Sequence, residues 1–212
     1  MAKPNNIILI RHGESEGNKD RKVYKTKQDY KLNLTSKGIE QARLAGSNLY
    51  GFLGGGNVQF YVSPFERARQ TYNEIVKFFP DSRYYESPEL REQEWSTRFR
   101  VDEEFAHDIE KERDKFGTFF YRFKNGESVA DVHSRVSIFL STMFRDFEKL
   151  DFPENCVIVG HGMLNRVFLM RWFHMKYEDF ETIRNPKNCG IFTLELQTDG
   201  KYKLTTELER YV

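Results

Sequence analysis

The sequence IILIRHG at residues 7–13 places four aliphatic residues directly before an arginine, His12 and a glycine. A second stretch, VIVGHG at residues 157–162, repeats this form around His161. Short apolar runs of this kind are typical of strands that are buried on both faces of a parallel sheet. Ligands bind beyond the carboxyl ends of such strands. We therefore expect the two imidazoles to meet at that edge if the two strands are neighbours.

Helical patterns follow these runs and a third apolar run at residues 59–62. Apolar residues at helical spacing predict helices over residues 35–53, 63–79, 128–150 and 163–173. Ser63 followed by proline, with Glu66 three residues on, predicts a capped helix start. The pair Asp199-Gly200 between residues 191–196 and 202–208 predicts a hairpin.

Buried strands that alternate with amphipathic helices predict the fold class α/β. We expect a three-layer, open and mostly parallel sheet with helices on both faces and an antiparallel strand pair near the C-terminus. No repeat, low-complexity tract or proline-rich linker divides the chain. Residues 1–212 are therefore expected to form a single domain.

Composition narrows the function classes. The 212 residues include 33 basic and 32 acidic side chains, a net charge of +1 that disfavours binding to nucleic acid or membrane through a basic field. The two cysteines belong to no CxxC or zinc-spaced cluster, so a disulfide framework is excluded. No apolar run approaches membrane-spanning length, and the residues before Ile7 do not resemble a signal peptide. The expected location is cytoplasmic.

A local anion site is predicted at the carboxyl edge of the sheet. Arg67 lies in the first turn of the helix that follows the strand at residues 59–62, so it can point at the same edge. Together Arg11, His12, Arg67 and His161 would form a cationic cluster suited to phosphate. The simpler interpretation of one such histidine is that it only hydrogen-bonds a backbone group at the end of its strand. The simpler interpretation of Arg67 alone is that it is a surface arginine.

These residues lie in motifs that resemble the histidine phosphatase superfamily, in its branch similar to cofactor-dependent phosphoglycerate mutases. Through REQ at 91–93, FFYRF at 119–123 and RVFL at 166–169, the chain also resembles small phosphoglycerate-mutase-like phosphatases of plants and fungi. The matching motifs run in family order: RHGES at 11–15 with Asn18, LTxxG at 34–38 with Gln41, Ser63-Pro64 with Arg67 and Thr71, LRE at 90–92, GES at 126–128, and His161-Gly162 with Arg166.

The resemblance implies phosphoryl transfer by double displacement, with His12 as the nucleophile that becomes phosphohistidine and Glu92 as general acid and base. It implies no metal and no cofactor. The residues implied to be catalytic are His12, Glu92, Arg11, Arg67 and His161. Those assigned to substrate binding are Asn18, Ser15, Gly162 and Tyr24.

Several assignments stay open. Glu94 is the rival proton donor, and either carboxylate could simply pair with Arg91 or Arg98. Many relatives follow this segment with an aromatic residue and glycine, whereas here Trp95 precedes Ser96. Glu127 is expected to be structural, as a helix-start acid, and Arg166 to support the site. Nearby aromatic residues could line a leaving-group pocket or belong to the core: Trp95, Phe99, Phe119, Phe120 and Tyr121.

Phosphoglycerate mutases carry a long insertion between the acid segment and the GES motif. Here only residues 93–125 lie between, which favours a phosphomonoester hydrolase acting on a small phosphorylated metabolite or a phosphorylated side chain. The alternatives are a 2,3-bisphosphoglycerate-dependent phosphoglycerate mutase and a phosphate-binding regulatory module with little turnover. The sequence leaves open whether the chain forms a homo-oligomer.

Overall fold

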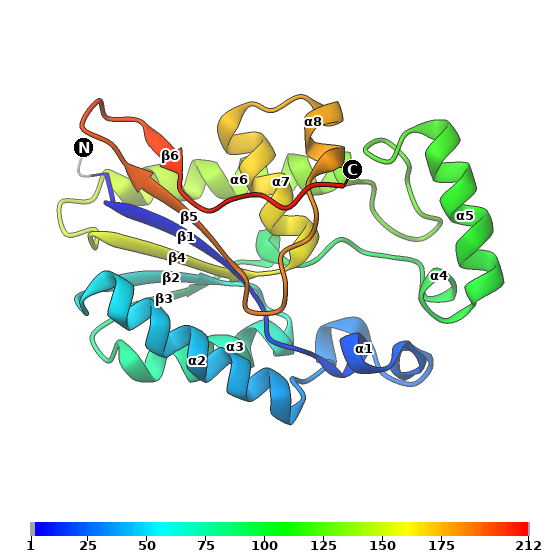
Figure 1. Cartoon of the computed structure of the whole chain (residues 1–212), viewed down its shortest axis with the longest axis horizontal. Coiled ribbons are helices and arrows are strands. Elements are labelled where there is room, and N and C mark those ends of the chain that lie inside the picture. The colour runs from blue at the N-terminus through cyan, green and yellow to red at the C-terminus, as the bar shows by residue number, and fades with distance from the viewer. Residues whose placement is uncertain (1–2, 212) are drawn as a thin grey trace.

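The computed structural model describes residues 3–211 and has a six-stranded sheet at its centre (Figure 1). The strand order is β3-β2-β4-β1-β5-β6. β1 to β4 form a parallel set, whereas β5 is antiparallel to both β1 and β6. The expected mostly parallel α/β sheet is confirmed. The strands span Asn6–Arg11 (β1), Val58–Val62 (β2), Arg83–Glu86 (β3), Asn155–Gly160 (β4), Ile191–Leu196 (β5) and Tyr202–Leu204 (β6).

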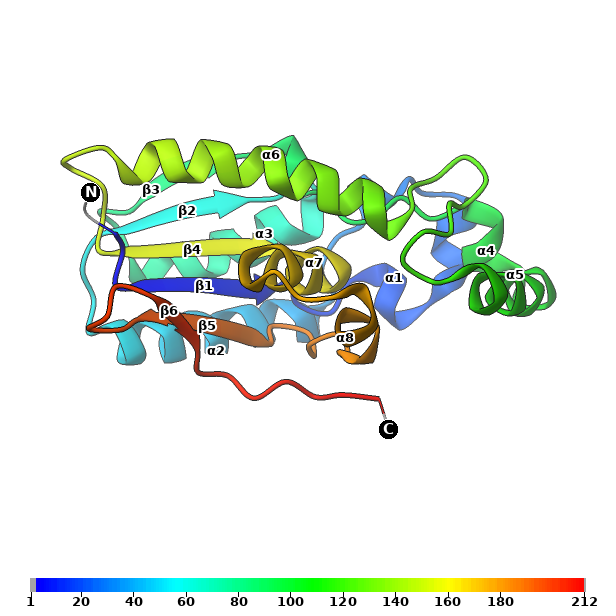
Figure 2. The same cartoon turned by 90° about the horizontal axis from the view of Figure 1, so that it is seen from above.

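Helices cover both faces of the sheet, which confirms the three layers (Figures 1 and 2). One face carries α2 (Ser36–Leu53) and α3 (Glu66–Ile75), and the other carries α6 (Val129–Phe147) and α7 (Gly162–Phe173). Ile8 and Ile10 belong to the core beside α2 and α3, whereas Ile7 and Leu9 belong to the core beside α6 and α7. Because successive strand residues face opposite sides, burial on both faces explains the unbroken apolar run.

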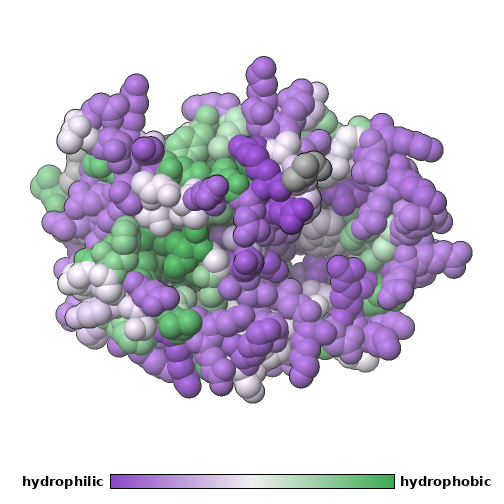
Figure 3. Space-filling model, in the orientation of Figure 1, coloured by the Kyte–Doolittle hydropathy of each residue, from purple (hydrophilic) through white to green (hydrophobic). Residues whose placement is uncertain are grey.

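Short helices lie beyond the carboxyl ends of β1 and β4 (Figure 2). They are α1 (Glu16–Lys19), the 3-10 helices η1 (Arg21–Lys25) and η2 (Asp29–Lys31), α4 (Thr97–Val101) and α5 (Glu103–Phe116). Helix α5 buries none of its residues, and its charged side chains contribute to the hydrophilic right-hand part of the surface in Figure 3. The carboxyl edge of the sheet is therefore bordered by two segments, residues 16–31 and residues 97–116.

The loop after β1 packs directly against the start of α2. A Cβ atom on Gly13 would lie 2.4 Å from the Gly38 carbonyl oxygen, and one on Gly38 would lie 2.1 Å from the Glu14 oxygen. Only glycine permits backbones to approach this closely. Thr35 caps α2 by accepting the Gly38 amide, so the LTxxG motif serves both the helix start and the loop that carries His12.

Two sequence predictions differ in detail from the structure. The predicted second hairpin strand reaches residue 208, but β6 ends at Leu204. Just beyond it, the Thr205 amide still donates to the backbone oxygen of Thr193, but the Thr193 amide is accepted by the Thr206 hydroxyl rather than by a backbone oxygen. Strand β3 carries no sequence signal because most of it is exposed at the edge of the sheet. Among residues 3–211, no helix is long and apolar enough to cross a membrane.

Candidate functional site

The two histidines of the sequence motifs meet at the carboxyl edge of the sheet. Strands β1 and β4 are parallel neighbours with Arg11 opposite Gly160, so His12 and His161 leave the sheet side by side. Their ring centroids lie 5.2 Å apart, and the rings are tilted by 63°. His12 is 4% exposed and His161 is fully buried. The expected juxtaposition of the imidazoles is confirmed.

The hydrogen bonds of His12 define which ring nitrogen is free to react. Nδ1 lies 2.7 Å from the Gly13 carbonyl oxygen, which can only accept, so Nδ1 carries the hydrogen. Nε2 accepts a hydrogen bond of 3.1 Å from Arg67 Nε and therefore carries the lone pair. Burial and the charges of Arg67 and Arg11 hold the pKa of His12 well below its ordinary value. His12 is thus a neutral imidazole whose lone pair lies on Nε2.

Arg67 reaches the site from the first turn of α3 and is almost completely buried. Its guanidinium lies over the Phe65 ring at 4.9 Å, and its NH1 donates to both the backbone oxygen and the carboxylate of Asp29. The loop bearing His12 is tied to the same helix, because Thr71 Oγ1 accepts the Gly13 amide. Helix α3 therefore fixes both the arginine and the histidine loop.

The predicted helix cap at Ser63 is wrong. Helix α3 begins at Glu66 with Phe65 as its N-cap, and the Ser63 hydroxyl instead shares a 2.7 Å hydrogen bond with His161 Nε2. The hydroxyl has this partner because β2 and β4 are neighbours and their carboxyl ends adjoin. Nδ1 of His161 finds no hydrogen-bond partner among residues 3–211. Burial, followed by the charge of Arg67, lowers the pKa of His161 well below its ordinary value.

Arg11 and the loop before β5 complete the wall beside His12. Arg11 NH1 donates to the Pro186 carbonyl oxygen at 2.6 Å, and Asn188 donates to the backbone oxygen of His12 and to the side-chain oxygen of Asn18. Burial lowers the pKa of Arg11, while the charge of Glu92 raises it. Asn188 was missed from the sequence, because no motif distinguishes its loop.

Of the two rival carboxylates, the structure brings Glu92 to the site. Glu92 Oε2 accepts the amide of Met163, in the first turn of α7, at 3.4 Å, and Oε1 accepts the Gln93 amide. Glu94 is 56% exposed and lies 3.6 Å from Arg91. Glu92 therefore lies against the turn that follows His161, whereas Glu94 lines the 620 Å³ cavity beside Phe65 and Trp95.

The four residues predicted to bind substrate differ in how close they lie to the two histidines. Ser15 is buried, and its hydroxyl forms the capping box of α1 with Asn18, so it is engaged in the fold. Asn18 is exposed next to Asn188. Gly162 begins α7, and Tyr24 lies beneath the Arg100 guanidinium at 4.3 Å. The structure brings Asn18 and Gly162 near the histidines and leaves Tyr24 at the rim.

Glu127 binds the segment of residues 91–94, which includes Glu92, rather than capping a helix. The cap of α6 is Ser128, whereas the Glu127 carboxylate pairs with Arg91 at 2.7 Å and Arg135 at 3.0 Å and accepts the Glu94 amide. The prediction that Glu127 is structural is consistent with these contacts, although capping is the wrong reason. Arg166 donates to the side-chain oxygen of Asn185 and to the backbone oxygen of Phe180, and its role in supporting the site stays a prediction.

We expect Glu127→Ala to lower the free energy of unfolding by about 3 kcal/mol, because it leaves two buried or half-buried arginines without their anion. For a chain of this length the melting temperature should fall by about 6–12 °C. Differential scanning calorimetry would measure the loss. Glu148→Ala, which removes an exposed carboxylate at the end of α6, is the control and should change the melting temperature by less than about 2 °C.

The aromatic residues considered for a leaving-group pocket divide between pocket and core. Trp95 lines a cavity of about 620 Å³ together with Asp29, Phe65 and Arg100. The Phe99 ring stacks on the Trp95 ring, with 5.5 Å between the ring centroids. Phe119 and Tyr121 are buried in the core, while Phe120 is half exposed against Tyr177. The cavity adjoins the histidines because Phe65 contacts both His161 and Arg67.

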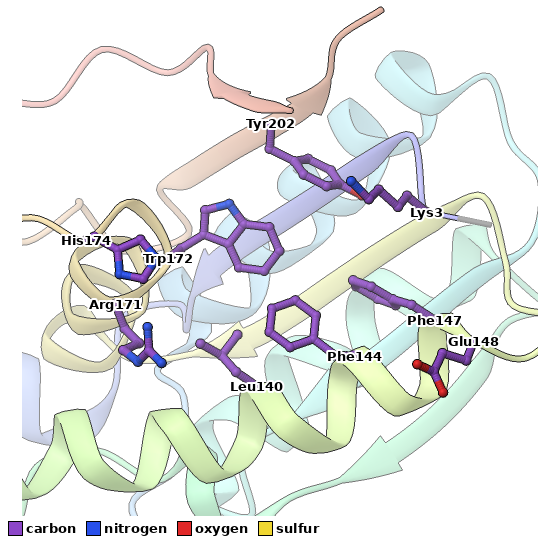
Figure 4. Close-up of a pocket in the computed structure, with 9 residues that line it drawn as sticks. All are labelled: Lys3, Leu140, Phe144, Phe147, Glu148, Arg171, Trp172, His174 and Tyr202. Carbon is purple, nitrogen blue, oxygen red and sulfur yellow. The ribbon is translucent and has the colours of Figure 1, made fainter. Parts of the chain in front are cut away.

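A more apolar cavity of about 520 Å³ lies at the other end of the sheet, between α6, α7 and β6 (Figure 4). Figure 4 shows Phe144, Phe147 and Trp172 facing it, with Arg171 and His174 at its rim. It includes none of the residues that surround His12. Within residues 3–211, no group of three or more His, Cys, Asp or Glu side chains is placed to hold a metal ion.

Comparison with known proteins finds relatives in sequence and in fold. The family model of the histidine phosphatase superfamily (branch 1) matches residues 7–207. The chain is 43% identical over 216 residues to the phosphoglycerate mutase-like protein AT74 of Arabidopsis thaliana, covering 95% of this chain and 68% of that protein. It is 30% identical over 306 residues to the broad-range acid phosphatase DET1 of Saccharomyces cerevisiae, covering 99% and 91%. The fold is similar to that of phosphoserine phosphatase from Entamoeba histolytica, with a TM-score of 0.71, 22% identity and 96% of each chain covered.

Proposed function

Because the chain belongs to the histidine phosphatase superfamily, we propose that it hydrolyses phosphomonoesters through a phosphohistidine on His12, with Glu92 as the general acid and base and without a metal ion. The observation that carries the proposal is the pair of hydrogen bonds that leaves a lone pair on Nε2 of a buried, neutral His12 beside Arg67. A neutral imidazole among fixed cations is a competent nucleophile toward a phosphate dianion.

The first step transfers the phosphoryl group to the enzyme. The lone pair of His12 Nε2 forms the nitrogen–phosphorus bond while the ester oxygen leaves with the electrons of the phosphorus–oxygen bond. Glu92, in its protonated form, donates a proton to that oxygen and becomes a carboxylate. As Nε2 becomes bonded to phosphorus, the Arg67 Nε–H that pointed at it is released toward a phosphoryl oxygen.

The second step returns the enzyme to its starting state. The Glu92 carboxylate takes a proton from water as the water oxygen attacks phosphorus, and the electrons of the nitrogen–phosphorus bond return to Nε2. Arg11, Arg67 and His161 stabilise the charge on the phosphoryl oxygens in both steps. For His161 the donor is Nδ1–H, since Nδ1 has no partner within residues 3–211 and Ser63 can donate to Nε2.

The proposed substrates are phosphorylated small molecules or phosphorylated side chains. The name of one relative, a broad-range acid phosphatase, supports hydrolysis of varied esters, and the open 620 Å³ cavity beside Phe65 offers room for the leaving group. The segment between Glu92 and Glu127 forms only the short α4 and the solvated α5. This supports hydrolysis over mutase chemistry, because a short segment supplies fewer groups to retain the intermediate for transfer back, which leaves the phosphoenzyme to react with water.

The test is steady-state hydrolysis of 4-nitrophenyl phosphate by the wild-type protein in excess EDTA, followed by a metabolite screen. Chelator-resistant release of phosphate supports the proposal. Activity that EDTA removes and added metal restores would contradict metal independence. No hydrolysis, together with isomerisation of 3-phosphoglycerate primed by 2,3-bisphosphoglycerate, would replace the proposal by a mutase. If the protein showed neither hydrolysis nor isomerisation, the remaining alternative would be a phosphate-binding regulatory module.

The lowered pKa of His12 predicts activity in acid. The nucleophile must be unprotonated, and burial with Arg67 and Arg11 keeps it so well below pH 6.5, the ordinary value for imidazole. We expect the acid limb of kcat/KM to move to higher pH in Arg67→Met, because one cause of the lowered pKa is removed. The ionisation of the substrate is the same for both proteins and cancels in this comparison. An acid limb that stays in place would contradict the role given to Arg67.

A further inference from the structure

Asp29 bridges two arginines that come from distant parts of the chain. Its Oδ1 accepts a hydrogen bond of 2.9 Å from NH1 of Arg67, and its Oδ2 accepts one of 2.9 Å from NH2 of Arg100. The side chains of Arg67, Arg100 and Asp29 are 4%, 14% and 23% exposed, so the bridge is largely shielded from solvent. Shielding makes such an arrangement far more directional than a surface ion pair.

The bridge determines which edge of the Arg67 guanidinium faces the reaction. Both hydrogens of NH1 are taken, one by the Asp29 backbone oxygen at 2.7 Å and one by its carboxylate. Nε points at His12 Nε2. Since a guanidinium is planar and rigid, fixing NH1 and Nε also fixes NH2. The Nε and NH2 donors then form the fork that meets the phosphoryl oxygens.

Arg100 connects the pair formed by Asp29 and Arg67 to the segment of residues 97–116. It lies on α4, stacks on the Tyr24 ring and holds the carboxylate oxygen that Arg67 leaves free. Asp29, Trp95 and Arg100 also line both the 620 Å³ cavity and a neighbouring one of about 220 Å³, so the bridge stands between the two cavities. The position of α4 is thereby linked to the arginine at the reacting centre.

We propose that Asp29 is a positioning residue that aims the Nε–NH2 edge of Arg67 at the transferring phosphoryl group, and that Arg100 holds Asp29 in place. The inference rests on the proposed function of the site. Misplacing a transition-state donor by about 1 Å costs about 100-fold in rate, so the expected loss appears mainly in kcat. The structure gives Asp29 no contact with His12, so it acts through Arg67 alone.

The test is a double-mutant cycle on hydrolysis of 4-nitrophenyl phosphate. Asp29→Ala should lower kcat by about 10- to 100-fold with a change in KM of less than about threefold. In an Arg67→Met background the same replacement should change kcat by less than about twofold, because there is no guanidinium left to aim. Equal losses in both backgrounds would overturn the proposal.

A second set of variants keeps the proposal testable if Asp29→Ala fails to fold. Arg100→Met should lower kcat by about 3- to 10-fold, and Arg100→Lys should restore most of it by returning a cation to the carboxylate. The matched control is Arg98→Met on the same helix, whose exposed partner is Asp102. A loss in Arg98→Met as large as in Arg100→Met, or no recovery with lysine, would overturn the role of Arg100. Wild-type hydrolysis tests the proposed function separately, since it does not depend on these variants.

Discussion

His12→Ala should lose at least about 1,000-fold in kcat toward every phosphomonoester, whatever its leaving group. The reason is chemical rather than structural. Nε2 of His12 holds the lone pair that forms the bond to phosphorus, and alanine offers no atom in its place. Steady-state release of inorganic phosphate from an aryl and an alkyl ester measures the loss.

The control for this variant is His107→Ala, which removes an exposed imidazole from the solvated helix α5 and should leave kcat unchanged. The fold should survive His12→Ala, because the loop remains held by the Gly13 amide on Thr71 and by the Gly13–Gly38 contact. A folded His12→Ala protein with more than about a tenth of wild-type activity would contradict the phosphohistidine mechanism.

Glu92→Gln should separate substrates by their leaving groups. Glutamine keeps an oxygen for the Met163 amide but cannot donate an acidic proton. For an alkyl phosphate, kcat/KM should fall by about 100- to 10,000-fold, since the alkoxide leaves poorly without a proton. For 4-nitrophenyl phosphate, kcat/KM should fall far less, because the phenolate needs little help and kcat/KM reports the phosphorylation step.

Glu94→Gln is the matched control, because the Glu94 side chain is 56% exposed and its carboxylate lies 3.6 Å from Arg91, three residues earlier in the chain. It should leave both kcat/KM values within about twofold of wild type. The assignment would reverse if Glu94→Gln showed the leaving-group dependence and Glu92→Gln did not. Equal losses on both esters in Glu92→Gln would make Glu92 a structural residue.

The fold was predictable from sequence where a strand is buried on both faces, because such a strand is a continuous apolar run. The run before His12 and the run before His161 are apolar because both faces of β1 and β4 are covered, and this pattern is visible in the sequence alone. Strand β3 and the early end of β6 were not predictable, since one is an exposed edge and the other depends on the Thr206 side chain. Tertiary context decides such segments more than local pattern does.

The candidate site was predictable where motifs mark it, at His12, Arg67, Glu92 and His161. Asp29 was missed because it lies in a polar loop whose only distinction is the two arginines it meets, 38 and 71 residues away. Ser-Pro-x-Glu at residues 63–66 fits the local pattern of a helix cap, although Ser63 does not cap the helix. Its true partner, His161, is 98 residues away. Pairings of this range are set by which strands are neighbours, and a single sequence does not show that.

The most direct test of the mechanism is to trap the phosphoenzyme. Glu92→Gln would be mixed with 4-nitrophenyl phosphate, quenched in alkaline denaturant to preserve phosphohistidine, and digested for mass spectrometry. Because Glu92 also activates the water of the second step, the account predicts a burst of nitrophenol and one phosphoryl group on His12 in most of the enzyme. A phosphoryl group on another residue, or rapid turnover with no modified peptide, would contradict it.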